Sequence, residues 1–174
     1  MSSDAGATEP DPPGAGPDVR EREFTLTRTV AGTPEQAFRA WTEAGRLARW
    51  LGPQGMRTPT DTVRVDARVG GGWEAVMVEE VSGERYPSAG TYRELVPFER
   101  IVFGWGVAGG GAPVTEFAVV TVTLTESGEG RTEVTLHQRG VLSAEDSDGM
   151  ADGWSTALDK LARELAEGGG TAAA

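Results

Sequence analysis

The feature that most constrains this fold is a long stretch of alternating apolar and polar residues followed by one amphipathic helix. Between residues 63 and 139 apolar positions recur at every second residue, as in Ile101, Phe103 and Trp105. Such alternation is typical of strands that bury one face. The connections between these segments are short, for example the turn at Pro97, which indicates an antiparallel meander. The chain therefore forms a sheet with an apolar face that another element must cover.

The last segment has a different period and can provide that cover. Apolar residues between 150 and 165 recur at spacings of three and four, which predicts a long amphipathic helix. Ser143 is the expected N-cap, and Gly168 is expected to close the helix. Trp154 lies on the apolar stripe, so we expect its ring to be enclosed between the helix and the sheet.

Ahead of the meander, the sequence predicts one strand and two short helices. Residues 23–30 alternate as a strand does. The sequence TPEQ at residues 33–36 combines an N-cap threonine, a proline at the first helical position and a glutamine that completes a capping box. The helix that it starts extends to Trp41, and a second short helix follows at residues 46–51. Residues 56–59 are predicted to be a loop.

The complete order predicts an α+β fold, a curved antiparallel sheet of about seven strands wrapped around the C-terminal helix. The strands are expected at residues 23–30, 63–65, 73–78, 89–96, 101–105, 117–125 and 132–139. A glycine-rich loop is expected at residues 106–112. A cavity can remain between sheet and helix wherever side chains do not fill the space.

The sequence predicts one folded domain, at residues 22–167, between two tails. Residues 1–21 contain four prolines and no large aromatic or branched aliphatic side chain beyond valine, so we expect a disordered acidic tail that folding does not need. Residues 168–174 have nothing to pack and are expected to be flexible.

Composition excludes several classes of protein. The chain has no cysteine and one histidine, so thiolate chemistry, zinc fingers and histidine-rich metal sites are excluded, and no metal or cofactor is expected. A net charge of −11 disfavours nucleic acid and anionic membrane surfaces as partners. The first residues have no apolar stretch typical of a secretory signal, so a cytoplasmic location is expected. Either a monomer or a homodimer is compatible with the sequence.

Several motifs resemble the family of heat-shock-protein-90 ATPase activator homologues, within the START-like (SRPBCC) superfamily. The segment LARWL at residues 47–51 is similar to its Leu-x-x-Trp motif. The segment DARVGGGW at residues 66–73 is similar to its Asp-x-Arg-Pro-Gly-Gly motif before a tryptophan, with Val69 in place of the proline. The segment GRTEVTL at residues 130–136 is similar to its Gly-x-Thr-x-Val strand, and Gly153 with Trp154 resembles its final-helix signature.

The resemblance implies the helix-grip fold and a binding role rather than a catalytic one. Members of the superfamily usually hold a hydrophobic small molecule in the cavity between sheet and helix. The family has no invariant catalytic constellation, so no catalytic residue is carried over. The namesake implies a possible protein partner, a chaperone, and a link to the stress response.

The expected ligand-binding residues are large apolar side chains on the inner faces of the strands and the helix. They are Trp73, Met77, Tyr92, Phe103, Trp105, Phe117 and Trp154. Aromatic rings and methionine suit apolar ligands because they offer contact area with few polar demands. The alternative for each of them is a place in an ordinary filled core.

Other candidate chemistry has a simpler explanation. The G-x-G-x-x-G match at residues 104–109 is followed by a strand, so it is interpreted as a hairpin rather than a nucleotide site. His137 falls on the opposite face from Val134 and Leu136, and we expect it to be solvated and not essential to function. The acidic residues Asp146 and Asp148 are interpreted as helix N-terminal residues rather than calcium ligands.

Some polar residues and two glycines have more than one interpretation. Arg68, Arg93 and Glu94 could give polar contacts to a ligand, but surface salt bridges are the preferred interpretation. Gly149 and Gly153 interrupt the helix either because it packs closely there or because the cavity opens there.

Three functions are therefore compatible with the sequence. The preferred one is non-catalytic binding of a hydrophobic small molecule. The first alternative is a protein-interaction or chaperone-regulator domain, which predicts a filled interior. The second is an enzyme of the cyclase or hydrolase type, which needs acid–base groups converging inside the cavity.

Overall fold

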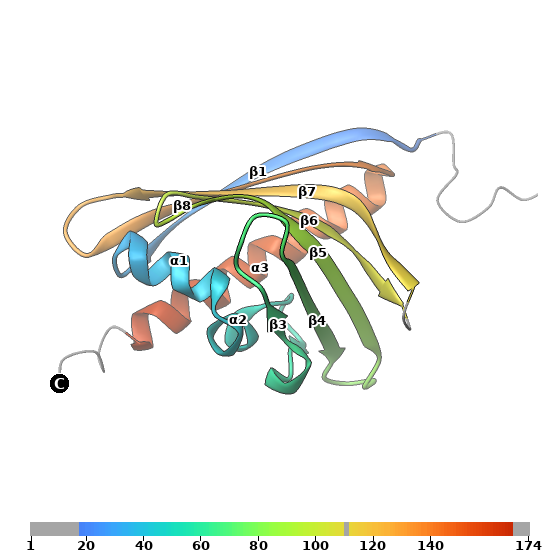
Figure 1. The fold of residues 1–174 in the computed structure, drawn as a ribbon, viewed down its shortest axis with the longest axis horizontal. Helices are drawn as coiled ribbons and strands as arrows, with labels where there is room; N and C mark the ends of the chain where they lie inside the picture. Colours follow the sequence, from blue (N-terminus) through green and yellow to red (C-terminus); the bar gives the residue numbers. More distant parts are fainter. Residues whose placement is uncertain (1–17, 110–111, 169–174) are drawn as a thin grey trace, which may run out of the picture.

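The computed structural model describes residues 18–109 and 112–168 (Figure 1). The elements, in chain order, are β1 (Arg20–Ala31), α1 (Pro34–Thr42), α2 (Ala44–Trp50), β2 (Met56–Arg57), the 3-10 turn η1 (Thr60–Thr62), β3 (Arg64–Val65), β4 (Gly72–Glu79), β5 (Arg85–Val96), β6 (Arg100–Gly109), β7 (Ala112–Glu126), β8 (Arg131–Leu142) and α3 (Ala144–Gly168). The predicted order of strand, two short helices, meander and long helix is confirmed. Among these residues, no helix combines the length and the apolar character that a membrane crossing requires.

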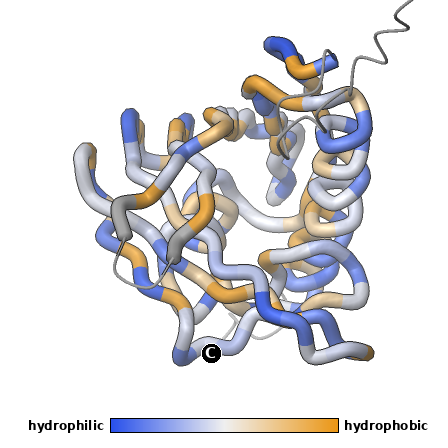
Figure 2. Tube along the Cα trace, turned by 90° about the vertical axis from the view of Figure 1, so that its right-hand side faces the viewer, coloured by the Kyte–Doolittle hydropathy of each residue, from blue (hydrophilic) through white to orange (hydrophobic). Residues whose placement is uncertain are grey.

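The strands form one antiparallel sheet in the order β1-β8-β7-β6-β5-β4-β2, with β3 also paired to β4. The first strand therefore closes on the last one, and its partner β8 leads directly into α3. The sheet curls, and α3 lies along its concave side, as Figures 1 and 2 show. This is the helix-grip arrangement that the sequence predicts.

Both predicted N-terminal helix caps are present. The Thr33 hydroxyl accepts a hydrogen bond from the Gln36 amide, and the Gln36 side chain accepts one from the Thr33 amide. These two bonds satisfy amide groups that the first turn of α1 leaves unpaired. At α3, the Ser143 hydroxyl accepts a hydrogen bond from the Asp146 amide at 3.0 Å.

The N-terminal boundary of the domain lies earlier than the sequence predicts. The predicted tail reaches residue 21, whereas β1 begins at Arg20, opposite Leu142 of β8. Asp18 comes before the strand and accepts a hydrogen bond from the Ala144 amide at 3.0 Å. Residues 18–21 thus belong to the folded domain. The rest of that predicted tail, residues 1–17, lies outside the described residues, as do residues 169–174 at the other end.

Two predicted loops are partly strands. Residues 56 and 57 form β2 and pair with the end of β4, so the loop prediction for residues 56–59 is wrong there. The predicted glycine-rich loop at residues 106–112 is also wrong over most of its length, because β6 continues to Gly109 and β7 starts at Ala112. Residues 110 and 111 lie outside the described part of the chain. The glycines of residues 106–112 are typical of a loop. These residues form strands because neighbouring strands provide partners for their backbone hydrogen bonds.

Three glycines let β5, β6 and β7 approach closely. A side chain at Gly90 would overlap the backbone carbonyl of Gly104, and one at Gly104 would overlap the Glu116 carboxylate. A side chain at Gly106 would overlap the backbone of Thr115. The Gly104 carbonyl accepts a hydrogen bond from Trp73 Nε1 at 3.1 Å. The first two glycines of the G-x-G-x-x-G match, Gly104 and Gly106, therefore have a packing role in the sheet.

The core lies between the concave face of the sheet and the helices. The apolar residues at alternate positions of β6, β7 and β8 are buried, as predicted for Ile101, Val120 and Leu136. On the helix, Trp154, Leu158 and Leu161 are buried against them. The prediction that the Trp154 ring is enclosed is confirmed, since only 6% of the residue is exposed.

Candidate functional site: an apolar cleft beside the C-terminal helix

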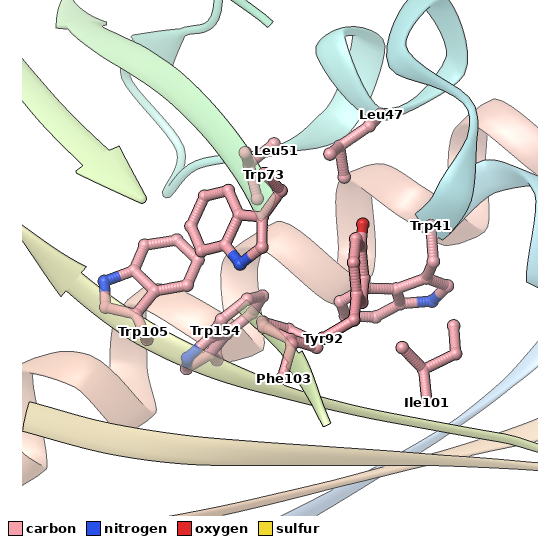
Figure 3. A pocket seen from close by; sticks show the side chains of 9 residues that line it. All are labelled: Trp41, Leu47, Leu51, Trp73, Tyr92, Ile101, Phe103, Trp105 and Trp154. Atoms are coloured by element: carbon pink, nitrogen blue, oxygen red, sulfur yellow. The ribbon is translucent and has the colours of Figure 1, made fainter. Parts of the chain in front are cut away.

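Aromatic rings fill most of the interior and leave one small cavity of about 20 Å³, shown in Figure 3. Its lining side chains are Trp41, Leu47, Leu51, Trp73, Tyr92, Ile101, Phe103, Trp105 and Trp154. A volume of this size is enough for about one water molecule. In this conformation the deep interior therefore has no room for a larger ligand.

A second, open cleft of about 780 Å³ lies nearer the surface. One side is the N-terminal half of α3, with Gly149 and Met150. The opposite side comes from the strands and the segment after α2. The complete lining is Leu51, Gly52, Pro53, Met77, Tyr86, Trp105, Phe117, Leu142, Glu145, Asp146, Gly149, Met150, Gly153, Trp154 and Ala157. Its volume falls within the range of about 300–1,000 Å³ that is typical of small-molecule sites.

Trp105 and Trp154 separate the two hollows. Both residues line the small cavity and the cleft, and their rings meet edge to face with centroids 5.2 Å apart (Figure 3). Trp105 also packs on Trp73, at a centroid distance of 4.8 Å. The floor of the cleft is therefore built from the rings that fill the core behind it.

A buried hydrogen-bond chain fixes this floor. Trp154 Nε1 donates to Gln138 Oε1 at 2.8 Å, and Gln138 Nε2 lies 3.2 Å from the sulfur of Met150. Gln138 is only 1% exposed, so its polar groups depend on these partners. Gln138 is not among the site residues that the sequence predicts. The sequence contains a signal for a buried polar group there, because residue 138 is polar and alternates in step with the inward-facing residues Val134 and Leu136.

The structure divides the seven predicted site residues between the two hollows. Trp73, Tyr92 and Phe103 line the small cavity only. Met77 and Phe117 line the cleft only, and Trp105 and Trp154 line both. Their role in ligand binding stays a prediction.

Phe117 reaches the cleft through an irregularity of the sheet. Trp105 pairs with Ala118 and Gly106 pairs with Glu116, so Phe117 is an extra residue in β7. Such a bulge changes the direction in which a side chain points. Simple alternation from Ala118 and Val120 would place Phe117 on the outer face.

The segment that connects α2 to β2 forms another wall of the cleft, and α3 holds it in place. Lys160 Nζ donates to the carbonyls of Gly52 and Met56, at 3.1 Å each. The Gln54 amide donates to Thr156 Oγ1 at 3.0 Å. Partial burial lowers the pKa of Lys160.

Gly149 and Gly153 differ in their surroundings. A side chain at Gly153 would come within 3.2 Å of Pro53, so the helix packs closely on the α2–β2 segment there. A side chain at Gly149 would meet no atom within 4 Å, and Gly149 lines the cleft. Each of the two predicted explanations therefore applies to one glycine.

Trp41 and Tyr92 bring polar groups into the core. Within the described residues, Trp41 Nε1 is buried without a hydrogen bond. The Tyr92 side chain is also buried, and burial raises the pKa of its hydroxyl, which therefore stays protonated. These groups lie among the aromatic residues behind the cleft floor.

The remaining polar candidates lie away from the cleft. His137 Nε2 lies 3.3 Å from Glu23 on the face of the sheet opposite the core, as predicted. Arg68 pairs with Asp66, Arg93 with Glu116 and Glu94 with Arg100, in agreement with the salt-bridge interpretation. Among residues 18–109 and 112–168 no group of acidic, histidine or cysteine side chains has the arrangement of a metal site.

The whole chain was compared with known proteins. Residues 31–166 match the family described as Activator of Hsp90 ATPase homolog 1-like protein. The chain belongs to this family. The match covers both short helices, every strand after β1 and nearly all of α3, so the family accounts for the elements that build the cleft.

Solved structures from bacteria share the fold. The protein CV1439 from Chromobacterium violaceum is 30% identical, with a TM-score of 0.70, and the match covers 82% of this chain and 96% of that one. The AHSA1 protein from Silicibacter pomeroyi is 29% identical, with a TM-score of 0.73, over 83% of this chain and 98% of that one. No curated protein matches the sequence.

Proposed function

We propose that this protein binds a hydrophobic small molecule in the cleft beside α3. The observation that carries the proposal is the cleft itself, about 780 Å³ in volume and lined mainly by apolar and aromatic side chains. Clefts of this kind are the usual sites of small-molecule recognition. Met77 and Met150 add flexible apolar contacts that adapt to the shape of a ligand.

The distribution of charged groups supports binding over catalysis. The small inner cavity has no acidic, basic or histidine side chain in its lining. The cleft has two carboxylates, Glu145 and Asp146, and both lie at its α3 side. A hydrolase or cyclase needs acid and base groups that converge on one point.

A chaperone-regulating role is the alternative that the family name raises. Such a role predicts a protein-binding surface whose function does not depend on an open cleft. The two functions can therefore be separated by a substitution that fills the cleft and leaves the outer surface unchanged.

Gly149→Leu is the substitution that fills the cleft. Its side chain enters open space, and replacing a helical glycine should raise stability by up to about 1 kcal/mol. Gly45→Leu is the matched control, because Gly45 is also helical, also has no atom within 4 Å of the added side chain, and lines neither hollow.

The measurement is a fluorescence titration with the neutral apolar probe N-phenyl-1-naphthylamine. We expect saturable binding to the original protein and to Gly45→Leu, and at least about tenfold weaker binding to Gly149→Leu. Absence of saturable binding, or equal binding by all three proteins, would contradict the proposal and favour the interaction function.

A further inference from the structure

The charged residues at the mouth of the cleft all have the same sign. Glu145 and Asp146 are the charged side chains of its lining, within the part of the chain that the structure describes. Both are exposed, and Ser143 Oγ fixes the Asp146 carboxylate through a hydrogen bond of 2.8 Å. No lysine or arginine of the described chain is among the lining residues.

A further carboxylate lies on the strand side of the mouth. Tyr86 lines the cleft from β5, and Glu84 precedes it by two residues. Interaction with the Glu84 carboxylate raises the pKa of the Tyr86 hydroxyl, and the charge of Glu79 acts in the same direction. Carboxylates thus lie on both sides of the mouth.

The cations that contact the cleft walls already have partners. Arg22 donates to the Leu142 carbonyl and pairs with Asp18. Lys160 donates to the carbonyls of Gly52 and Met56. Both cations are thus engaged by groups of the protein, and neither lines the cleft.

The floor of the cleft suits the apolar part of a ligand. Trp154 donates its N–H to Gln138, so the ring offers the ligand its apolar surface. Trp105 and Phe117 add further aromatic surface. Aromatic rings give a large apolar contact area with few polar demands.

We propose that the cleft selects hydrophobic molecules that carry a protonated amine, with the amine at the acidic mouth and the apolar part over Trp105 and Trp154. This inference rests on the proposed function, because it assigns a ligand class to the same cleft. It excludes fatty acids and other hydrophobic anions as preferred ligands.

The test compares decylamine, decanol and decanoate, which share one alkyl chain and are respectively cationic, neutral and anionic at neutral pH. Each competes with bound N-phenyl-1-naphthylamine on the full chain at concentrations that form no micelles. We expect decylamine to bind about fivefold more tightly than decanol, and decanoate to bind most weakly. Added salt should reduce the preference for decylamine and leave decanol unaffected.

A matched pair of variants separates the mouth from the overall negative charge. Glu145→Gln and Glu167→Gln remove the same charge from exposed positions of α3, but only Glu145 lines the cleft. We expect Glu145→Gln to reduce the preference for decylamine over decanol by about twofold. Glu167→Gln should leave that preference unchanged.

The outcomes distinguish the two proposals. Probe binding with decanoate at least equal to decylamine would overturn the amine proposal and leave the cleft as a binding site. An equal effect of Glu145→Gln and Glu167→Gln would also overturn it, because overall charge would then explain the preference. A failure of the probe to bind would overturn the proposed function, and the amine proposal with it.

Discussion

At the scale of single residues, one buried glutamine controls the central ring of the cleft. Gln138 links Trp154 of α3 to β8 and also contacts Met150, so one side chain positions two cleft residues. A buried amide needs these partners because an unmet hydrogen bond in the core costs about 1–3 kcal/mol. The hydrogen bond to Gln138, as well as packing, therefore determines the orientation of Trp154.

The first prediction concerns Trp154. Trp154→Ala should reduce the free energy of unfolding by about 3–5 kcal/mol, because it removes a large buried ring. Trp154→Phe retains most of the apolar volume but leaves Gln138 Oε1 without its donor, which should cost about 1–3 kcal/mol. Chemical denaturation of both variants measures these losses.

The double variant Trp154→Phe with Gln138→Leu provides the control. Removing both partners leaves no orphaned oxygen, so the double variant should be more stable than the sum of the single losses predicts, with a coupling of about 0.5–3 kcal/mol. Simple additivity would show that the hydrogen bond does not stabilise the fold.

At the scale of elements, the N-terminal segment and α3 support each other. Asp18 accepts a hydrogen bond from the Ala144 amide and pairs with Arg22 of β1. The hydrogen bond from the Ala144 amide lowers the pKa of Asp18 below its ordinary value of 3.8. Desolvation opposes this effect, and the positive charges of Arg22 and Arg20 add to the lowering. The negative charge also interacts favourably with the positive end of the α3 dipole.

The second prediction is a pH-dependent effect of Asp18→Asn. Because the folded-state pKa of Asp18 is lowered, its charge contributes stability above the unfolded-state value, and this contribution is lost as the pH falls through the folded-state pKa. The variant should therefore melt at a lower temperature than the original protein at neutral pH, and the difference should vanish in strong acid.

Asp152→Asn is the comparison, since Asp152 is an exposed carboxylate of the same helix whose side chain has no ion pair or hydrogen bond among the described residues. At neutral pH, Asp152→Asn should lower the melting temperature less than Asp18→Asn does. A difference for Asp18→Asn that persists unchanged in acid would show that its charge is not what stabilises the helix start.

Elements with a clear hydrophobic period or a local capping motif were predictable from the sequence. Elements that form only because a neighbouring strand offers backbone partners were not. The capping box at Thr33 and the stripe around Trp154 are local patterns, and both are confirmed. Strand β2 has two residues and forms because β4 offers it backbone partners. Glycines within β6 suggested a loop, whereas close approach of neighbouring strands requires them.

At the scale of the whole molecule, one wall of the cleft is the α2–β2 segment, which α3 holds in place. Lys160 bonds two carbonyls of this segment, and Gly153 allows Pro53 to pack on the helix. The wall of the site thus depends on a charged side chain more than one hundred residues away in sequence.

The third prediction is that Lys160→Met loosens this wall. The methionine retains the apolar stem but leaves the carbonyls of Gly52 and Met56 without their donor, so the free energy of unfolding should fall by about 1–3 kcal/mol. Amide exchange in residues 52–56 should become faster, and the affinity for N-phenyl-1-naphthylamine should fall. Lys160→Arg retains a cationic donor and should lose less, and equal exchange in all three proteins would contradict the role of Lys160.

The sequence by itself determined the order of elements, the faces of the strands and the family, because period, caps and turns are properties of neighbouring residues. It also identified the side chains that surround the interior. Only the tertiary structure decided that aromatic rings fill the deep cavity and that the open volume lies beside α3. The bulge that turns Phe117 inward, and the bond between Gln138 and Trp154, depend on the register of strands far apart in sequence. The volume and the charge of the cleft depend on residues that are far apart in sequence, so no local sequence pattern predicts them.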